Sequence, residues 1–134
     1  MVKRLLDIGV RSLMFPYVQT VEEARRAVAA TRYPPAGIRG VAGTTRATAY
    51  GRVKDYAKIA GGEICVVVQA ETQKAIDAAA DIARVDGVDC VFIGPNDLSA
   101  SMDRMGNTGA PEVQSAIAQG LANTVHVLHP EVCV

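Results

Sequence analysis

Two apolar runs of similar form constrain the fold of this sequence more than any other feature. They are "EICVVVQAE" at 63–71 and "CVFIGPND" at 90–97, and the segment between them repeats apolar residues at helical spacing. A continuous β-branched run is expected of a strand whose two faces are both covered, as in parallel sheets. A strand, a helix and a second strand in this order predict parallel strands joined by a right-handed crossover. We therefore expect an α/β protein with a parallel sheet and flanking helices.

The rest of the chain extends this pattern within one domain, 1–134, in which we see no internal repeat or domain boundary. The spacing of Thr20 and Glu23 is that of a capping box, which predicts the start of a helix. Pro111 is expected to begin another helix. Helices are expected at 2–8, from Thr20 to "YPPAG" (33–37), at about 53–60, at 72–87 and from Pro111 to about Asn123. Strands are expected at 11–18, 63–71, 90–93 and, in "TVHVLH", 124–129. The segment 37–52 is expected to be a loop.

Composition argues against several classes of partner. The chain has 14 basic and 14 acidic residues and a formal net charge of zero, which gives no electrostatic case for nucleic acid or an anionic membrane. No apolar run reaches the roughly 20 residues of a membrane span, and the amino terminus does not have the form of a signal peptide. The three cysteines form no CxxC spacing, so we expect reduced structural thiols and a cytoplasmic location.

Two acidic residues follow the two apolar runs directly. Glu71 ends the first run and Asp97 follows the second, so in a parallel sheet both lie at the carboxyl edge, where α/β proteins bind ligands. If the strands are neighbours, the two acids stand about 5 Å apart. Carboxylates so close repel unless one is protonated or a cation lies between them, and Mg²⁺ or Mn²⁺ suits the second case. The alternative is that Glu71 caps the next helix and Asp97 caps a turn.

Four segments together resemble the HpcH/HpaI family of metal-dependent pyruvate aldolases. They are "LLDIGVRSLMFPYVQT", "TRYPPAGIRGV", "VVVQAET" and "GVDCVFIGPNDLSA", and the resemblance runs from about residue 2 to about residue 119. It implies part of a TIM (β/α)₈ barrel. It also implies a carbon–carbon lyase that cleaves a 4-hydroxy-2-oxo acid to pyruvate and an aldehyde, with a divalent metal (Mg, Mn or Co) as cofactor.

The resemblance also implies roles for single residues. Glu71 and Asp97 match the two protein ligands of the metal, and Asp97 also lies against the substrate. Gln69 matches the glutamine that contacts pyruvate, and Asn96 matches the position whose backbone amide does the same. Asp7 matches the acid that makes the family's catalytic histidine more basic. Ala70 departs from the pattern, in which a larger aliphatic residue is expected.

The chain also departs from the family in extent. A TIM barrel has eight strands in about 250 residues, whereas this sequence is expected to supply about four, beginning inside the third helix of the barrel. The parts that carry the catalytic histidine and a transition-state arginine are then absent, and the tail at 120–134 diverges. A truncated or frameshifted reading frame and a deliberate half-barrel both explain this. The alternative to an aldolase is a non-catalytic remnant that self-associates or complements another chain.

Self-association is expected because a partial barrel leaves sheet edges unpaired. It would also leave an apolar face open, for which the candidates are Val66, Val68, Val91 or Ile93. A homo-oligomer is therefore the expected state, with pyruvate or another 2-oxo acid as the small-molecule partner.

Two further groups of residues have a functional and a plain interpretation. His126, His129 and Cys133 are metal-capable, but a zinc site needs a fourth ligand, and a frayed terminus is favoured. Arg39, Arg46 and Arg52 lie among loop glycines. They could hold a phosphate or a substrate carboxylate, but no phosphate-loop pattern is present and solvated loop charges are favoured.

Overall fold

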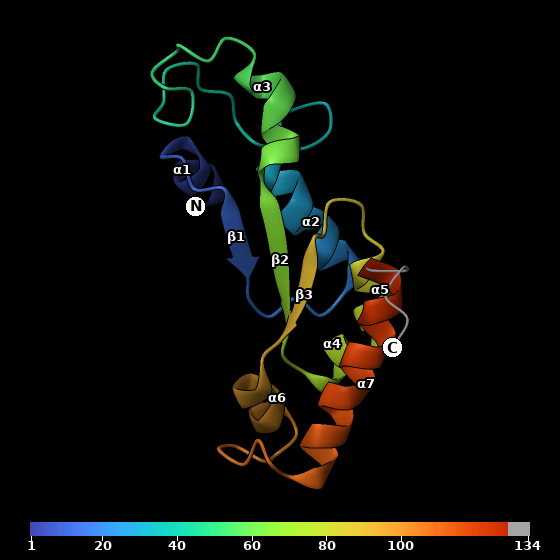
Figure 1. The fold of residues 1–134 in the computed structure, drawn as a ribbon. Helices are drawn as coiled ribbons and strands as arrows, with labels where there is room; N and C mark the ends of the chain where they lie inside the picture. The colour runs from blue at the N-terminus through green and yellow to red at the C-terminus, as the bar shows by residue number, and fades with distance from the viewer. Residues whose placement is uncertain (129–134) are drawn as a thin grey trace.

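The computed structural model describes residues 1–128 and shows three parallel strands with helices packed beside them (Figure 1). The strand order is β1-β2-β3, so the expected parallel sheet and its flanking helices are confirmed. The elements are α1 (Val2–Asp7), β1 (Ser12–Phe15), α2 (Val21–Thr31), α3 (Tyr56–Ile59), the 3₁₀ helix η1 (Ala60–Glu63), β2 (Cys65–Ala70), α4 (Gln73–Asp77), α5 (Ala79–Ala83), β3 (Cys90–Ile93), α6 (Pro95–Ser101) and α7 (Pro111–Leu128).

The middle strand fixes the register of the sheet. Val66 of β2 pairs with Leu13 of β1, and Val68 pairs with Val91 of β3. Because side chains alternate across a strand, this register puts Leu13, Val66, Val68 and Val91 on one face. On that face Val66 and Val68 are 2% and 1% exposed, and they pack against Val28 of α2 and Ile82 of α5.

The prediction that Val66, Val68, Val91 or Ile93 face an open side is therefore wrong, because these residues lie on the helix-covered face. The opposite face carries the alternate residues of the three strands. Met14 and Phe92 on it are 51% and 44% exposed, and Cys90 is exposed as well. We call Met14, Cys65, Val67, Cys90 and Phe92 the open face.

A second core cluster joins the carboxyl half of the sheet to the last helix. Ile76 of α4, Leu98 of α6 and Val113 of α7 are fully buried in it, with Ile93 packed against it. A Cβ atom at Gly120 would come within 2.7 Å of the side chain of Ile93, so glycine at this position allows α7 to approach β3 closely.

The strand expected at 124–129 is wrong for the residues that the structure describes. Residues 124–128 continue α7, and the Thr124 hydroxyl donates to the backbone oxygen of Gly120 at 2.9 Å, one turn earlier. His129 lies outside the described residues. The alternation of Val125 and Val127 resembles a strand, but the packing of α7 against α5 and β3 favours the helix.

Two further helices differ from expectation. The helix expected at 72–87 is two shorter helices, α4 and α5, separated at Ala78. The helix α6 was not expected; it begins with Pro95, a favoured first residue. The Thr20 half of the capping box is confirmed, since its hydroxyl accepts from the Glu23 amide at 3.2 Å. The reciprocal bond differs, because the Glu23 carboxylate accepts from the Gln19 amide and not from that of Thr20. Over residues 1–128, no helix has both the length and the apolar character of a membrane span.

Candidate metal and substrate site

The carboxylate of Glu71 is held from two sides at the carboxyl end of β2. Its Oε1 accepts a hydrogen bond from the Gln69 side-chain amide at 3.0 Å, and its Oε2 accepts one from the Tyr17 backbone N–H at 2.8 Å. Glu71 is 5% exposed. A buried carboxylate fixed in this way keeps one orientation, while each oxygen retains a lone pair for another partner.

Glu71 does not cap the helix that follows it. That role belongs to Thr72, whose hydroxyl accepts from the Ala75 amide at 3.2 Å. The interpretation of Glu71 as a helix cap is therefore wrong, and capping does not explain why its carboxylate is buried.

Asp97 lies in the first turn of α6, beside the end of β2. The strands β2 and β3 are neighbours, with Ala70 opposite Ile93, and the Gly94 amide donates to the Ala70 carbonyl at 3.1 Å. Asn96 precedes Asp97 in the same turn, so its backbone amide has no partner one helical turn earlier. Asn96 and Asp97 are both exposed. The carboxyl edge of the sheet thus carries one buried and oriented acid, Glu71, and one exposed acid, Asp97.

Asp7 lies at the other end of the sheet. It is the last residue of α1, which precedes β1 and stands at the amino edge (Figure 1). Because β2 spans six residues at about 3.3 Å each, the two edges are about 20 Å apart. The structure therefore places Gln69, Glu71 and Asn96–Asp97 at one edge of the sheet and Asp7 at the other.

The surroundings of Asp7 form a compact charged cluster. Lys3 and Arg39 both pair with its carboxylate, the Arg39 Nη2 at 3.1 Å. Burial raises the pKa of Asp7, but the hydrogen bonds and charges of Lys3 and Arg39 outweigh it and hold the pKa below the ordinary 3.8. The expectation of a solvated Arg39 is wrong, because this side chain is 0% exposed. Its Cζ atom lies 4.4 Å from the centre of the Tyr33 ring and 5.6 Å from the centre of the Tyr56 ring.

Sequence reasoning missed two residues of the carboxyl edge. One is Tyr17, whose backbone has φ of 58° and donates to Glu71. The other is Gly94, where a Cβ would lie 2.6 Å from Glu71 Oε1. Pro16 in "FPYVQT" signals the turn that ends β1. Nothing local indicates that the backbone N–H of the next residue, Tyr17, donates to Glu71, 54 positions away.

Among residues 1–128, no group of three or more His, Cys, Asp or Glu side chains forms a metal cage. Two carboxylates alone fit a Mg²⁺-type ion, which takes one or two protein carboxylates and completes its shell with water and substrate oxygens. The zinc hypothesis falls on His129 and Cys133, which lie outside the described residues, and on the side chain of His126, which is likewise not described.

Comparison with known proteins decides the family. The model of the HpcH/HpaI aldolase/citrate lyase family matches residues 1–125. The chain belongs to this family. Over 121 residues it is 57% identical to the hydroxypyruvate/pyruvate aldolase of Sagittula stellata. The matched region covers 90% of this chain and 48% of that protein. The chain is 53% identical over 121 residues to the 4-hydroxy-2-oxo-heptane-1,7-dioate aldolase of Salmonella paratyphi A, with 90% and 46% covered.

Solved structures agree. An HpcH/HpaI aldolase/citrate lyase family protein from Burkholderia cenocepacia matches with a TM-score of 0.91 at 44% identity, over 94% of this chain and 51% of the other. The HpcH/HpaI aldolase from Desulfitobacterium hafniense gives 0.81 at 34% identity, over 94% and 49%. The expected family and the barrel-derived α/β fold are confirmed. The chain spans about half the length of the relatives it matches.

Proposed function

We propose that this chain provides the metal-binding part of an aldolase site that cleaves a 4-hydroxy-2-oxo acid to pyruvate and an aldehyde. The observation that carries the proposal is the buried carboxylate of Glu71, oriented by Gln69 and by the Tyr17 amide at the ligand-binding edge of the sheet. Burying a charged group is costly unless it is both paired and hydrogen-bonded. Glu71 accepts hydrogen bonds, but no basic side chain of residues 1–128 pairs with it.

Glu71 and Asp97 would hold a divalent metal, Mg, Mn or Co. When bound, such an ion acts as a Lewis acid on the oxygens of a 2-oxo acid. The chain's own contribution is positional. Gln69 fixes Glu71 with its amide and keeps its side-chain oxygen free, and the Asn96 amide is a hydrogen-bond donor for the substrate.

The acid–base step needs groups other than these. Taking the proton from the 4-hydroxyl with a positioned base contributes about 10²–10⁴-fold to the rate, and the family resemblance assigns that base to a histidine for which this sequence has no counterpart. Losing one charge-stabilising donor costs a further factor of roughly 10²–10³. We therefore expect slow metal-dependent proton exchange of pyruvate and negligible aldol cleavage from the 134-residue chain.

Calorimetric titration with Mn²⁺ tests the site itself. Glu71→Gln and Asp97→Asn should each weaken binding by at least about tenfold, the loss that even outer-shell substitutions can cause. Asp86→Asn is the matched control, because its side chain is 97% exposed in the turn that leads into β3, at the amino edge. Equal affinity in all four proteins would refute the assignment.

Proton exchange tests the chemistry. Exchange of the pyruvate methyl protons in heavy water, followed by NMR with added Mn²⁺, should be detectable for the parent chain and lost in Glu71→Gln. An aldolase assay run beside it should show no turnover. Robust cleavage by this chain would mean that a residue within it replaces the missing base.

A second candidate is a non-catalytic chain that self-associates or complements another. The observation that favours it is the open face, where Met14 and Phe92 are 51% and 44% exposed. Within residues 1–128, the edge strands β1 and β3 each pair with one strand, β2. Apolar area and unpaired edges of this kind recruit other chains. We propose a homo-oligomer on this basis. We also propose a cytoplasmic location, which the free thiols of Cys65 and Cys90 support.

A further inference from the structure

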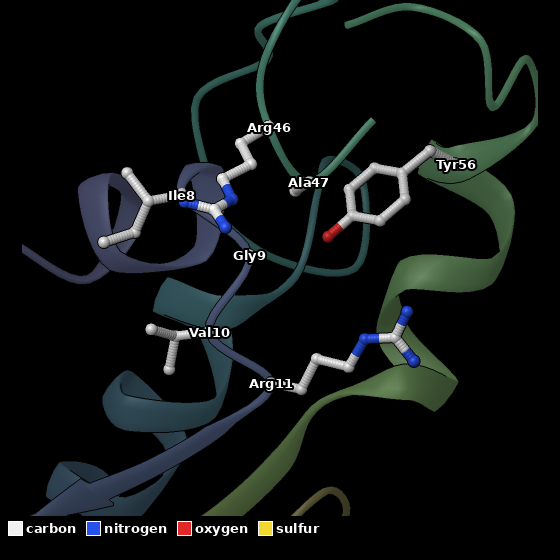
Figure 2. A pocket seen from close by; sticks show the side chains of 7 residues that line it. All are labelled: Ile8, Gly9, Val10, Arg11, Arg46, Ala47 and Tyr56. Atoms are coloured by element: carbon white, nitrogen blue, oxygen red, sulfur yellow. The ribbon is translucent and has the colours of Figure 1, made fainter. Parts of the chain in front are cut away.

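A cavity at the amino edge of the sheet lies away from the carboxyl-edge acids. It measures about 400 Å³, within the range of small-molecule sites. Its lining comes from the turn between α1 and β1 and from the segment that leads into α3, and comprises Ile8, Gly9, Val10, Arg11, Arg46, Ala47 and Tyr56 (Figure 2). The lining contains two arginines and a phenol and no carboxylate.

The polar groups of this cavity come from different elements, and the side chain of Arg11 extends away from Arg46 (Figure 2). Figure 2 shows the hydroxyl of Tyr56 directed into the space between Gly9 and Ala47, with the guanidinium of Arg46 reaching toward Gly9. The Ala47 amide donates to the backbone oxygen of Asp7 at 3.0 Å, which ties the Arg46 segment to α1. The backbone of the Arg46 segment is therefore fixed beside α1, while the side chain of Arg46 is exposed.

The local charge is positive although the chain as a whole is neutral. Arg11 pairs with Glu63 through one nitrogen at 2.6 Å, which leaves its other donors free of that carboxylate. No carboxylate of residues 1–128 lies within ion-pair distance of Arg46. When the ion pairs of Asp7 and Glu63 beside the cavity are included, the basic groups are Lys3, Arg11, Arg39 and Arg46, and the acids are Asp7 and Glu63.

Arg39 adds to this potential from behind the cavity wall. Its guanidinium shares the single carboxylate of Asp7 with Lys3, and its Nε and Nη1 atoms are buried without a hydrogen-bond partner. It stacks on the ring of Tyr56, whose hydroxyl faces the cavity. A buried cation that is only partly balanced raises the positive potential nearby, because screening is weak in the interior.

We propose that this cavity binds the phosphate group of a small phosphorylated compound, or inorganic phosphate itself, through Arg46 and the Tyr56 hydroxyl. The planar guanidinium matches the spacing of phosphate oxygens and can form two hydrogen bonds with them. Since the cavity lies at the edge opposite Glu71 and Asp97, the bound anion would be separate from the proposed metal site and independent of it.

Titration with inorganic phosphate in the presence of EDTA tests the site, because the chelator removes any contribution from metal at Glu71. Arg46→Gln should weaken phosphate binding by about tenfold, the value of one charge-assisted hydrogen bond. Arg52→Gln is the matched control: it makes the same change in the same loop, outside the cavity lining, and should leave the affinity within about twofold. Equal losses in both variants would show that only net charge matters and would overturn the proposal.

Two further arms sharpen the result. Tyr56→Phe keeps the ring that stacks on Arg39 and removes the hydroxyl, so the variant should fold as the parent does and bind phosphate about tenfold more weakly. Succinate replaces phosphate in a parallel titration. Tighter binding of this dicarboxylate, or no saturable binding of phosphate, would overturn the assignment of the ligand class.

Discussion

Glu71 fills the space that any side chain at position 94 would occupy. A Cβ added to Gly94 would lie 2.6 Å from Glu71 Oε1 and 2.7 Å from its Cγ. The glycine of the "GPND" turn is thus required by the carboxylate of the neighbouring strand, because the two residues stand at matching ends of β2 and β3. A substitution at position 94 can therefore displace the side chain of Glu71 while leaving its carboxylate chemically unchanged.

Gly94→Ala should destabilise the fold by about 1–3 kcal/mol, the usual cost of forcing extra atoms into a packed site. It should also weaken Mn²⁺ binding, since Glu71 must move to make room. Urea denaturation and calorimetric titration measure the two effects. Gly61→Ala is the control, because a Cβ there meets nothing within 4 Å. An alanine at 94 that left both properties unchanged would contradict the packing described above.

The ion pair between Asp7 and Arg39 should make stability depend on pH. Asp7→Asn leaves the buried Arg39 guanidinium without its carboxylate, and breaking a buried pair in this way costs about 3–5 kcal/mol. Because the pKa of Asp7 is held below its ordinary 3.8, its contribution is fully present above that value and is lost as the pH falls through the lower folded-state pKa. The stability difference between parent and variant should therefore be constant near neutral pH and shrink as the pH falls below 3.8.

Urea denaturation at a series of pH values measures this difference. Asp86→Asn serves as the control, since its side chain is 97% exposed and its contact with Arg32 spans 3.6 Å. That substitution should change stability by less than about 0.5 kcal/mol at every pH. A difference for Asp7→Asn that persisted unchanged into acid would show that its cost does not come from the charge.

Tyr17 should prefer replacement by glycine over replacement by alanine. Its φ of 58° lies in the left-handed region, which costs about 1–2 kcal/mol for a residue with a Cβ. Tyr17→Gly should thus be more stable than Tyr17→Ala by about 1 kcal/mol, and both should retain Mn²⁺ binding because Glu71 accepts from the backbone. The same pair of substitutions at Met14, within β1, should give the opposite order, since glycine weakens a strand by about 0.5–1 kcal/mol relative to alanine. Thermal denaturation of the four variants decides it.

The open face should drive self-association. Light scattering coupled to size-exclusion chromatography should show the parent chain as an oligomer and Met14→Ser/Phe92→Ser shifted toward monomer, with little loss of folding stability, because both side chains are about half exposed. Ile38→Ser/Val41→Ser is a matched control, since those residues are 74% and 73% exposed in the loop before α3. A parent chain that stayed monomeric at high concentration would argue against this interface.

The parts of the fold that the sequence predicts are those with a local cause. The β-branched run of β2 and the helix cap at Thr20 both act within a few residues, and the structure contains both. Alternating β-branched residues predict a strand at 124–128, whereas the contacts of α7 with α5 and β3, from distant parts of the chain, make it a helix. Propensity is a weak guide where tertiary packing decides.

The candidate site divides in the same way. Glu71 and Asp97 could be identified because each follows a strand, and parallel pairing places strand ends together. The burial of Arg39 could not be predicted, because Asp7 lies 32 residues before it and the two tyrosine rings come from separate segments. Loop arginines among glycines are ordinarily solvated, and only the assembled cluster shows that this one is enclosed.

The spacing of the contacts around β2 also favours one order of folding. The Val66 amide reaches Asp89 across 23 residues, whereas the Tyr17 amide reaches Glu71 across 54. Closing a longer loop costs more entropy, by about 0.6 kcal/mol for each doubling, and long-range parallel pairing is slow. We therefore expect β2 and β3 to pair first and β1 to join them later. Glu71 would then acquire its second hydrogen bond only in the last stage of folding, so that the site matures as the sheet is completed.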